Sequence, residues 1–307
     1  MTLQKRSYAQ GHFELRIDGH ATTAYLKSVE GGFSKVSVVD EPIGPHNERI
    51  KHSSTVEIDP ISIEFGISGA KDILKWIQKS WRKQHMRYSG QITHADFNLH
   101  PTFEHEMMDC LITETAFPTL DGSSKEAGFL KCKIQPERTK YRTLPPSESK
   151  IKSDLGRKQK SWLPSNFRFT IDGIDDMQYT NKLDGFTVKQ GIKKFYTGED
   201  RFPTIEPTKI EFPNLSGTIA LAYADKLFKW HEEMVMKGGK DHRLQKSGAI
   251  EFLSPDLKQT LFTINLFEIG IANVTIDKST ANTDSIKRVK FELYVGRMDI
   301  DGSLGLE

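Results

Sequence analysis

The chain has 307 residues, and its 43 basic and 41 acidic side chains leave a formal net charge of +2. This balance gives no general case for binding nucleic acid or a membrane surface. At about 150 residues per domain the length predicts two domains, each able to bury its own core. No apolar run reaches the roughly 18 residues of a membrane helix, and the polar first residues lack a secretory signal, so we expect a soluble protein made in the cytoplasm.

The first predicted strand opens a stretch that the chain contains twice. Residues 13–19 read FELRIDG, and residues 167–173, which start 154 positions later, read FRFTIDG. Both copies alternate apolar and polar side chains, as a strand with one buried face does, and both end in an Asp-Gly turn signal. A repeat in the same order through the chain predicts two copies of one domain.

The first half continues with a strand that begins at Gly32-Phe33 and then a long segment, residues 40–51. This segment carries two prolines, a glycine and mixed charge, and it is expected to form a long loop or an extended hairpin arm with a functional role. An amphipathic helix is predicted over 70–83, with Trp76 on its apolar face. Alternating runs predict the other strands, at 56–58, 61–65, 90–99, 107–116 and 129–134.

Residues 136–164 are rich in basic side chains, proline and serine and are interpreted as a linker. A solvated tether is the first interpretation, and an arm along an acidic neighbouring subunit is the second. The predicted domains are therefore 1–138 and 164–307, with the linker at 139–163.

The second half repeats the plan. A long loop is predicted over 195–207, and a helix over 223–237 that carries Trp230 and ends at Gly238. The strands are predicted at 167–171, 186–188, 209–221, 249–253, 261–276 and 286–295. The fold class is mainly β: two tandem β-barrels or sandwiches, each flanked by one helix.

The repeat also selects the expected core anchors. Trp76 and Trp230 are again 154 residues apart, while Gly32-Phe33 answers Gly185-Phe186 about one residue out of step. Core packing is favoured for both tryptophans over a role as base-stacking platforms. The expected anchors are Phe13, Phe33, Trp76, Phe167, Phe186 and Trp230.

Few residues suggest chemistry. The two cysteines, Cys110 and Cys132, are expected to be buried free thiols, with a disulfide between neighbouring strands as the alternative. One ionisable cluster could hold a metal, but it matches no metal signature and the second copy lacks its histidines, so a polar loop is favoured. Its members are His94, Asp96, His100, Glu104, His105, Glu106 and Asp109. We expect no enzyme activity and no cofactor, since neither a nucleophile elbow nor a phosphate loop occurs.

The order of these elements resembles the phage tail-tube family, which includes the inner tubes of contractile phage tails and of extracellular contractile injection systems. The resemblance rests on the opening strand with Ile-Asp-Gly, the Gly-Phe strand, the long loop, and a hairpin that runs into a helix with a central tryptophan. It covers about residues 12–138 and again 166–300, and no single motif in it is specific. A standard tube subunit is one domain, whereas this chain has two.

The resemblance implies a structural component of a phage tail or injection particle, in which six barrels form a ring around a lumen. It implies a homo-oligomer, with a pseudo-sixfold trimer favoured over a hexamer of two stacked rings. Other tube, baseplate, hub or cap proteins would be its partners, nucleic acid or a toxin could be the cargo, and assembly would occur in the bacterial cytoplasm, with later release outside the cell. Contacts to the next ring would fall on Asp40, Pro42, Pro45, Asn47, Arg49, Lys51, Phe195, Glu199, Arg201 and Pro203.

Two other functions stay open from the sequence. One is a free-standing double-barrel module that binds a peptide or a small ligand. The other is a metal-dependent enzyme that uses the cluster at 94–109.

Overall fold

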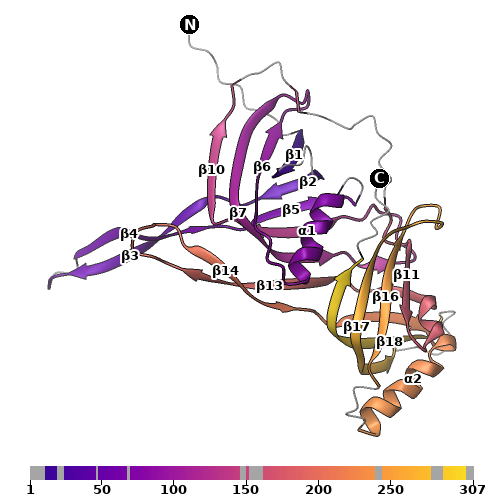
Figure 1. Cartoon of the computed structure of the whole chain (residues 1–307). Helices are drawn as coiled ribbons and strands as arrows, with labels where there is room; N and C mark the ends of the chain where they lie inside the picture. The colour runs from indigo at the N-terminus through magenta and orange to yellow at the C-terminus, as the bar shows by residue number, and fades with distance from the viewer. Residues whose placement is uncertain are drawn as a thin grey trace.

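The computed structural model describes residues 11–18, 24–45, 48–67, 70–145, 150–151, 162–238, 244–277 and 286–301. Most of these residues lie in strands, with two α-helices, α1 (Lys71–Trp81) and α2 (Asp225–His231), packed beside them (Figure 1). The mainly β fold class predicted from the sequence is confirmed. Among the described helices, none is both long enough and apolar enough to cross a membrane.

The first half folds into a closed barrel of six strands. Around the barrel the order is β7-β6-β1-β2-β5-β9, and β9 pairs back with β7, which leaves no free edge between them. Alternate side chains of these strands point inside, because successive residues of a strand face opposite sides. The strands are β1 (His12–Ile17), β2 (Ala24–Glu30), β5 (Ile61–Phe65), β6 (Tyr88–Ala95), β7 (Pro101–Phe117) and β9 (Leu130–Gln135).

Strand β10 (Arg138–Thr143) continues the line of β9 along β7, from Arg138 opposite Met108 to Thr143 opposite Phe103. The sequence placed these residues in the linker, and the structure instead makes them part of the first barrel. Their basic side chains alternate with strand-favouring Thr139, Tyr141 and Thr143, so composition concealed the period of two.

The second half uses the same strand order but stays open. Its order is β11-β16-β17-β18-β15-β12, and β8 (Leu120–Asp121) from the first half pairs beside β12. Between β11 and β12 lie the 3-10 helix η1 (Asp175–Tyr179) and one isolated bridge, which joins Ile171 to Ile174. The strands are β11 (Phe167–Ile171), β12 (Thr180–Leu183), β15 (Leu215–Ala220), β16 (Lys246–Leu253), β17 (Thr260–Ile276) and β18 (Arg288–Ile300).

The long strands β7 and β17 match in detail. Asp109 in β7 and Glu268 in β17 both adopt left-handed backbone, with φ of 52° and 57°. Four residues farther on, each strand bulges against its partner, at 112–114 against β9 and at 271–273 against β18. These shared irregularities fix which residues of the two strands correspond.

The two helices carry equivalent tryptophans. The indole N–H of Trp76 donates to the carbonyl of Met86, and that of Trp230 donates to the carbonyl of Leu244, both at 3.0 Å. Regular α-helix ends earlier in the second half than the expected 223–237, because a π-helical turn, η3 (Glu232–Met236), follows α2. Gly238, with φ of 67°, ends this segment as expected of a glycine C-cap.

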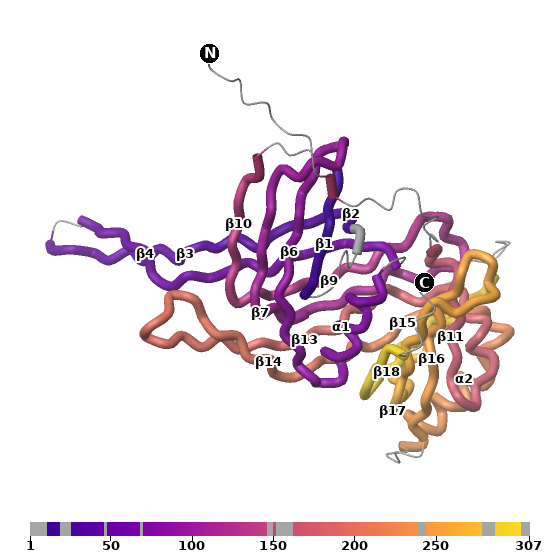
Figure 2. Tube along the Cα trace, turned by 45° about the horizontal axis from the view of Figure 1, so that its top comes forward, coloured from indigo at the N-terminus to yellow at the C-terminus, as the bar shows by residue number. Residues whose placement is uncertain are grey.

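Each half also carries a two-stranded ribbon. The first ribbon is β3 (Ser34–Ile43) with β4 (Glu48–Ile58), and the second is β13 (Phe186–Phe195) with β14 (Thr204–Glu211). The first ribbon projects from the barrel as a long arm, and the second runs below the barrel toward the base of this arm (Figure 2). Residues 40–51 therefore form the outer part of a hairpin arm, one of the two expected forms. The expected loop at 195–207 contains strand residues at both ends.

The expected core anchors have different surroundings. Trp76, Trp230 and Phe186 are at most 4% exposed, and Phe13 and Phe167 are partly buried against the core. The prediction for Phe33 is wrong, because its side chain is 46% exposed. Gly31 and Gly32, both with positive φ, turn the chain so that Phe33 lies outside the barrel, against Phe103, His105 and Tyr141.

Both cysteines are buried free thiols. Cys110 lies opposite Tyr88 and Cys132 lies opposite Thr115, so the strand register does not bring the two sulfurs together as a cross-strand pair. Burial raises the pKa of both thiols, which leaves them protonated and unreactive at neutral pH.

Candidate functional site

The two halves of the chain meet edge to edge at β13. Its first residues pair antiparallel with the end of β7, from Phe186 opposite Phe117 to Lys189 opposite Glu114. The second ribbon thereby extends the sheet of the first barrel. Strand addition of this kind gains affinity from main-chain hydrogen bonds and specificity from alternate side chains. We call the paired segments 114–117 and 186–189, with the side chains packed on them, the junction.

The exchange of strands is reciprocal. Just after the junction, Leu120 and Asp121 of β8 pair with Leu183 and Lys182 of β12, so the first half extends the second sheet. The N–H of Gly122 also donates to the carbonyl of Asn181 at 3.0 Å. Each half therefore supplies backbone partners to an edge of the other.

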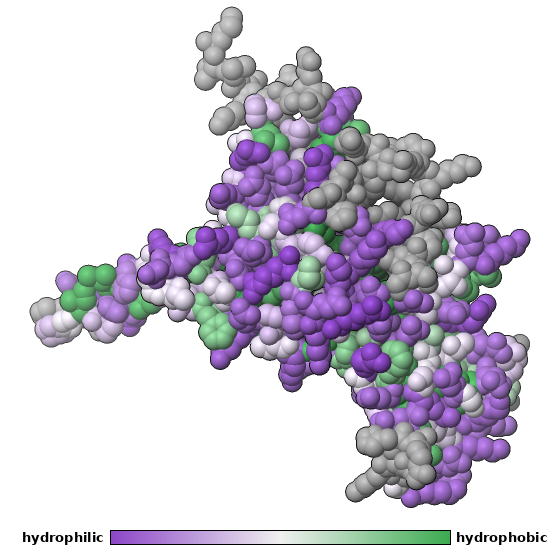
Figure 3. Space-filling model, in the orientation of Figure 1, coloured by the Kyte–Doolittle hydropathy of each residue, from purple (hydrophilic) through white to green (hydrophobic). Residues whose placement is uncertain are grey.

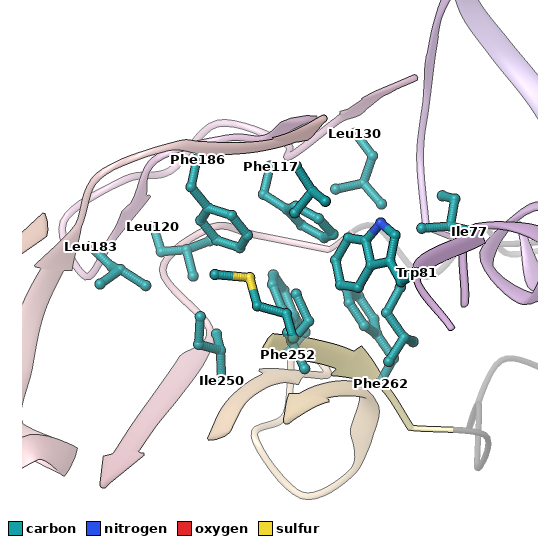
Figure 4. Close-up of a cluster of buried hydrophobic side chains, with 14 of the residues drawn as sticks. Ile77, Trp81, Phe117, Leu120, Leu130, Leu183, Phe186, Ile250, Phe252 and Phe262 are labelled. Carbon is teal, nitrogen blue, oxygen red and sulfur yellow. The ribbon is translucent and has the colours of Figure 1, made fainter. Parts of the chain in front are cut away.

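Aromatic side chains fill the junction (Figure 4). Phe117 stacks on Phe186 with ring centroids 4.8 Å apart. The ring centroids of Phe252 and Phe262 lie 5.9 and 6.4 Å from that of Phe117. Trp81, the last residue of α1, meets Phe117 edge-on at 6.1 Å. Such pairs add about 0.5–1.5 kcal/mol beyond area burial. The result is one continuous core that spans both halves.

Helix α1 of the first half also binds the end of β18 in the second. Two nitrogens of the Arg82 guanidinium each donate to a carboxylate oxygen of Asp299 at 2.8 Å. The side-chain amide of Gln78 donates to the carbonyl of Ile300 at 2.6 Å. The paired guanidinium contact fixes orientation as well as distance.

A second polar contact holds β14 against the first barrel. Arg87 donates to the carboxylate of Glu137 and to the carbonyl of Ile205. Glu137 in turn accepts from the N–H of Ile205 at 2.8 Å. Sequence analysis missed these residues, because partners so far apart in the chain leave no local pattern.

In the described structure no third strand pairs with the first ribbon, although Glu57 near its base forms an ion pair with Lys194 of β13 at 3.6 Å. Strands β3 and β4 form a two-stranded sheet of their own, so their outer edges carry unpaired backbone groups. Hydrophobic side chains are exposed along the arm (Figure 3). They are Val36, Val38, Ile43 and Ile50. An exposed apolar ribbon of this kind is typical of a surface that binds another protein.

The residues predicted to contact the next ring lie on both ribbons. On the first they are Asp40, Pro42, Pro45, Arg49 and Lys51, all exposed, and Asn47 lies outside the described residues. Asp40 pairs with Lys51 across the ribbon and accepts from Arg49 at 3.1 Å. Residues 40–43 and 48–51 therefore form a strand pair and not an irregular loop.

On the second ribbon the predicted residues are Phe195, Glu199, Arg201 and Pro203. Phe195, Glu199 and Arg201 are exposed, while Pro203 is buried. In the same turn, Asp200 forms an ion pair with Arg138 of β10. The turn of this ribbon therefore contacts the first half of its own chain, at β10.

The ionisable cluster at 94–109 is spread along β6, β7 and their connection. The carboxylate of Asp96 accepts from the backbone N–H groups of Asn98 and His100, both at 2.9 Å, and Glu104 accepts from Arg142. Within the described ranges, no three His, Cys, Asp or Glu side chains gather closely enough to hold a metal ion. The geometry therefore gives this cluster structural contacts instead of a ligand set.

Two of its histidines predict a pH dependence. Burial lowers the pKa of His94, helped by nearby His105, and burial also lowers the pKa of His105. The unfolded chain then binds more protons than the folded chain as pH falls through the ordinary histidine pKa of about 6.5. We expect the free energy of unfolding to decrease from pH 7 to pH 5, and this decrease to be smaller in an H94F/H105F variant. Denaturant titrations at both pH values measure it, and equal decreases in both proteins would contradict this account.

Solved structures similar to this chain include parts of an extracellular contractile injection system and of the anti-feeding prophage. A chain of the PVC sheath–tube complex in the extended state aligns at 14% identity over 44% of this chain and 87% of its own, with a TM-score of 0.36. The tube-terminating cap of the anti-feeding prophage aligns at 11% identity over 47% and 96%, with a TM-score of 0.40. Hcp1 from Flavobacterium johnsoniae aligns at 14% identity over 45% and 95%, with a TM-score of 0.27. No family model and no curated protein matches the sequence.

Proposed function

We propose that this chain is a non-enzymatic structural subunit of a phage tail or contractile injection system, which forms or terminates the inner tube as a ring around a lumen. One observation carries the proposal: the two halves join by adding the ribbon of one to the barrel edge of the other. The order of elements that resembles the tail-tube family supports it.

The proposal includes an internal duplication. The matching bulges, left-handed residues and tryptophan hydrogen bonds support descent of both halves from one barrel. We propose domains at 1–138 and 164–307 joined by a linker at 139–163, whose first residues pair with β7 of the first barrel as part of β10.

The junction is a heterologous contact, since it uses a ribbon on one half and a strand edge on the other. A contact of this type continues from copy to copy until it closes a ring or forms a filament. If each ring holds six barrels, as the resemblance implies, three chains supply them.

Two linker residues that hydrogen-bond to the first half favour halves that lie side by side in one ring. The N–H of Ile151 donates to the carbonyl of Leu99 at 2.9 Å, and the N–H of Gly128 donates to the carbonyl of Trp162 at 3.0 Å. Together with the lateral strand pairing, these contacts support a trimer with pseudo-sixfold symmetry over a hexamer of two stacked barrels.

The partners in this proposal are other tube, baseplate, hub or cap proteins of the same particle. Assembly would take place in the bacterial cytoplasm, and the finished particle would carry the subunit outside the cell. Nucleic acid or a toxin would pass through the lumen.

Native mass spectrometry of the purified chain tests the proposal. We expect a species of three times the chain mass of 34.9 kDa. A species of six chains would support the stacked form instead. A monomer at assembly concentrations, with no larger species, would overturn the ring and leave a free-standing binding module as the better interpretation.

A further inference from the structure

We infer that the base of the first ribbon, residues 32–35, adds as a strand to the outer edge of residues 273–276 in a second copy of this chain. This inference rests on the proposed ring. It extends that proposal because it names the two surfaces and their register.

The junction inside the chain is the template. On β7, residues 101–110 pair with β6, and farther along the same side residues 114–117 pair with β13. The other side of β7 is taken by β9 and β10. At the end of β7 both edges are therefore paired, one with β9 of the same half and the other with β13 of the second half.

The end of β17 corresponds to the end of β7 but has one edge unfilled. β16 pairs with residues 260–269 on one side, and β18 pairs with β17 from Ile264 to Ile276 on the other. Beyond Ile269, no strand in the described ranges takes the side that β16 occupies. The matched bulges place residues 273–276 where β7 has 114–117.

The first ribbon corresponds to the ribbon that fills that edge on β7. Lys35 lies opposite Glu57 as Lys189 lies opposite Glu211. Both ribbons bulge directly afterwards, at 36–38 and at 190–192. On β3, the edge away from β4 has no partner strand in the part of the chain that the structure describes.

Apolar side chains are exposed in the second half at positions equivalent to buried ones in the first half. Phe117 is 3% exposed in the junction, and its counterpart Ile276 is 56% exposed. Trp81, five residues after Trp76, is 5% exposed, whereas Val235, five residues after Trp230, is 46% exposed. The turn η3 that carries Val235 packs beside β17, as α1 packs beside β7. The second half therefore presents apolar groups where the first half buries them.

The base of the first ribbon also carries exposed aromatic side chains that suit the apolar end of β17. At the base of the first ribbon, Phe33 and Tyr141 are 46% and 54% exposed and lie against Phe103 and His105. An aromatic cluster beside an open strand edge can cover the apolar end of β17 when the edges pair. Repetition of the intrachain contact makes a second copy the fitting occupant, since each copy then offers one ribbon and one edge.

The template fixes the register. Val188 lies opposite Thr115 in the junction, so Ser34 of one copy should lie opposite Val274 of the next. One residue along, Lys35 should lie opposite Asn273. Directly opposed residues of antiparallel strands have Cα atoms about 4.5–5.5 Å apart, which suits a disulfide.

Disulfide trapping tests this pairing. We expect S34C/V274C and K35C/N273C to form covalent oligomers under mild oxidation, ending at the ring size found by native mass spectrometry. The off-register control V38C/V274C moves one sulfur roughly 13 Å along the strand and should cross-link at least about tenfold less. Ser34, Lys35, Val38 and Asn273 are exposed, so the folded state should tolerate their replacement. Val274 packs partly against the core, and cysteine is a small apolar side chain that suits such a place. The native Cys110 and Cys132 are buried.

A deletion of residues 42–47 serves as a second control. It shortens the arm without touching its base, so in-register cross-linking should persist. If neither in-register pair cross-links while the ring mass is retained, this inference fails and the ring proposal stands. If no oligomer forms in any variant or in the unmodified chain, both fail. Equal cross-linking of the off-register control would also overturn the register.

Discussion

Replacing Trp76 or Trp230 by alanine should lower the free energy of unfolding by about 3–5 kcal/mol in each case. Trp76 is 2% exposed and Trp230 is 4% exposed, so each change removes a large buried ring. Each also leaves a carbonyl, of Met86 or Leu244, without its indole donor. The two losses should be similar, because the two tryptophans occupy equivalent places. Denaturant titration of each variant measures them.

Two sets of controls separate packing from hydrogen bonding. Trp76→Phe and Trp230→Phe keep most of the ring and lose the N–H, so each should cost about 1 kcal/mol from the hydrogen bond and somewhat more from lost volume. Met236→Ala removes an apolar side chain that is 74% exposed and should change stability by less than about 0.5 kcal/mol. Near-neutral results for both alanine variants would mean that the helices do not pack as described. They would also favour the alternative in which both tryptophans are exposed platforms that stack on bases.

The elements that sequence analysis placed well are those with local periodicity. The strands β1 and β11 alternate because one face of each packs on the core, where Leu15 and Ile17 of β1 and Phe169 and Ile171 of β11 are buried. The helix over Lys71–Trp81 shows its apolar face at helical spacing, because Ile73, Trp76 and Ile77 all pack inward. Local sequence is enough wherever burial is one-sided.

Local periodicity could not predict the strands of the first ribbon. The described residues of 40–51 have no buried face, so nothing selects an alternating pattern there, and prolines and charges are tolerated. Their length, their prolines and the family resemblance marked them as candidate contact segments. The π-helical turn after α2 had no sequence signal either, since an extra residue in a helical turn does not change composition.

The junction could not be predicted from the sequence. Pairing of Phe186 with Phe117 depends on where two distant strands end in space, and each residue alone looks like an ordinary core phenylalanine. The repeat even favoured a wrong comparison, because it aligned exposed Phe33 with buried Phe186. The ribbon register, in which Lys35 and Lys189 correspond, restores the offset of 154 and places Thr187, not Phe186, at the position equivalent to Phe33.

Replacing Phe117 by alanine should also lower the free energy of unfolding by about 3–5 kcal/mol, here by loosening the contact between the halves. Its ring lies among Phe186, Phe252, Phe262 and Trp81, so the cavity would open where both halves contribute walls. Denaturant titration gives the size of the loss. The exposed Phe97, which is 70% exposed, provides the matched control, and Phe97→Ala should be within about 0.5 kcal/mol of neutral.

A double-mutant cycle shows whether the loss belongs to the junction. Phe117 and Phe186 stack at 4.8 Å with planes 16° apart, so F117A/F186A should be less destabilised than the sum of the two single variants, by about 0.5–1.5 kcal/mol. Additive losses would mean that each ring packs only within its own half. In that case only the backbone pairing of residues 186–189 would join the halves at this edge. The same pairing between two copies would then gain little binding energy from the apolar side chains at the end of β17. A positive coupling energy supports aromatic packing as part of the contact that the ring is proposed to repeat.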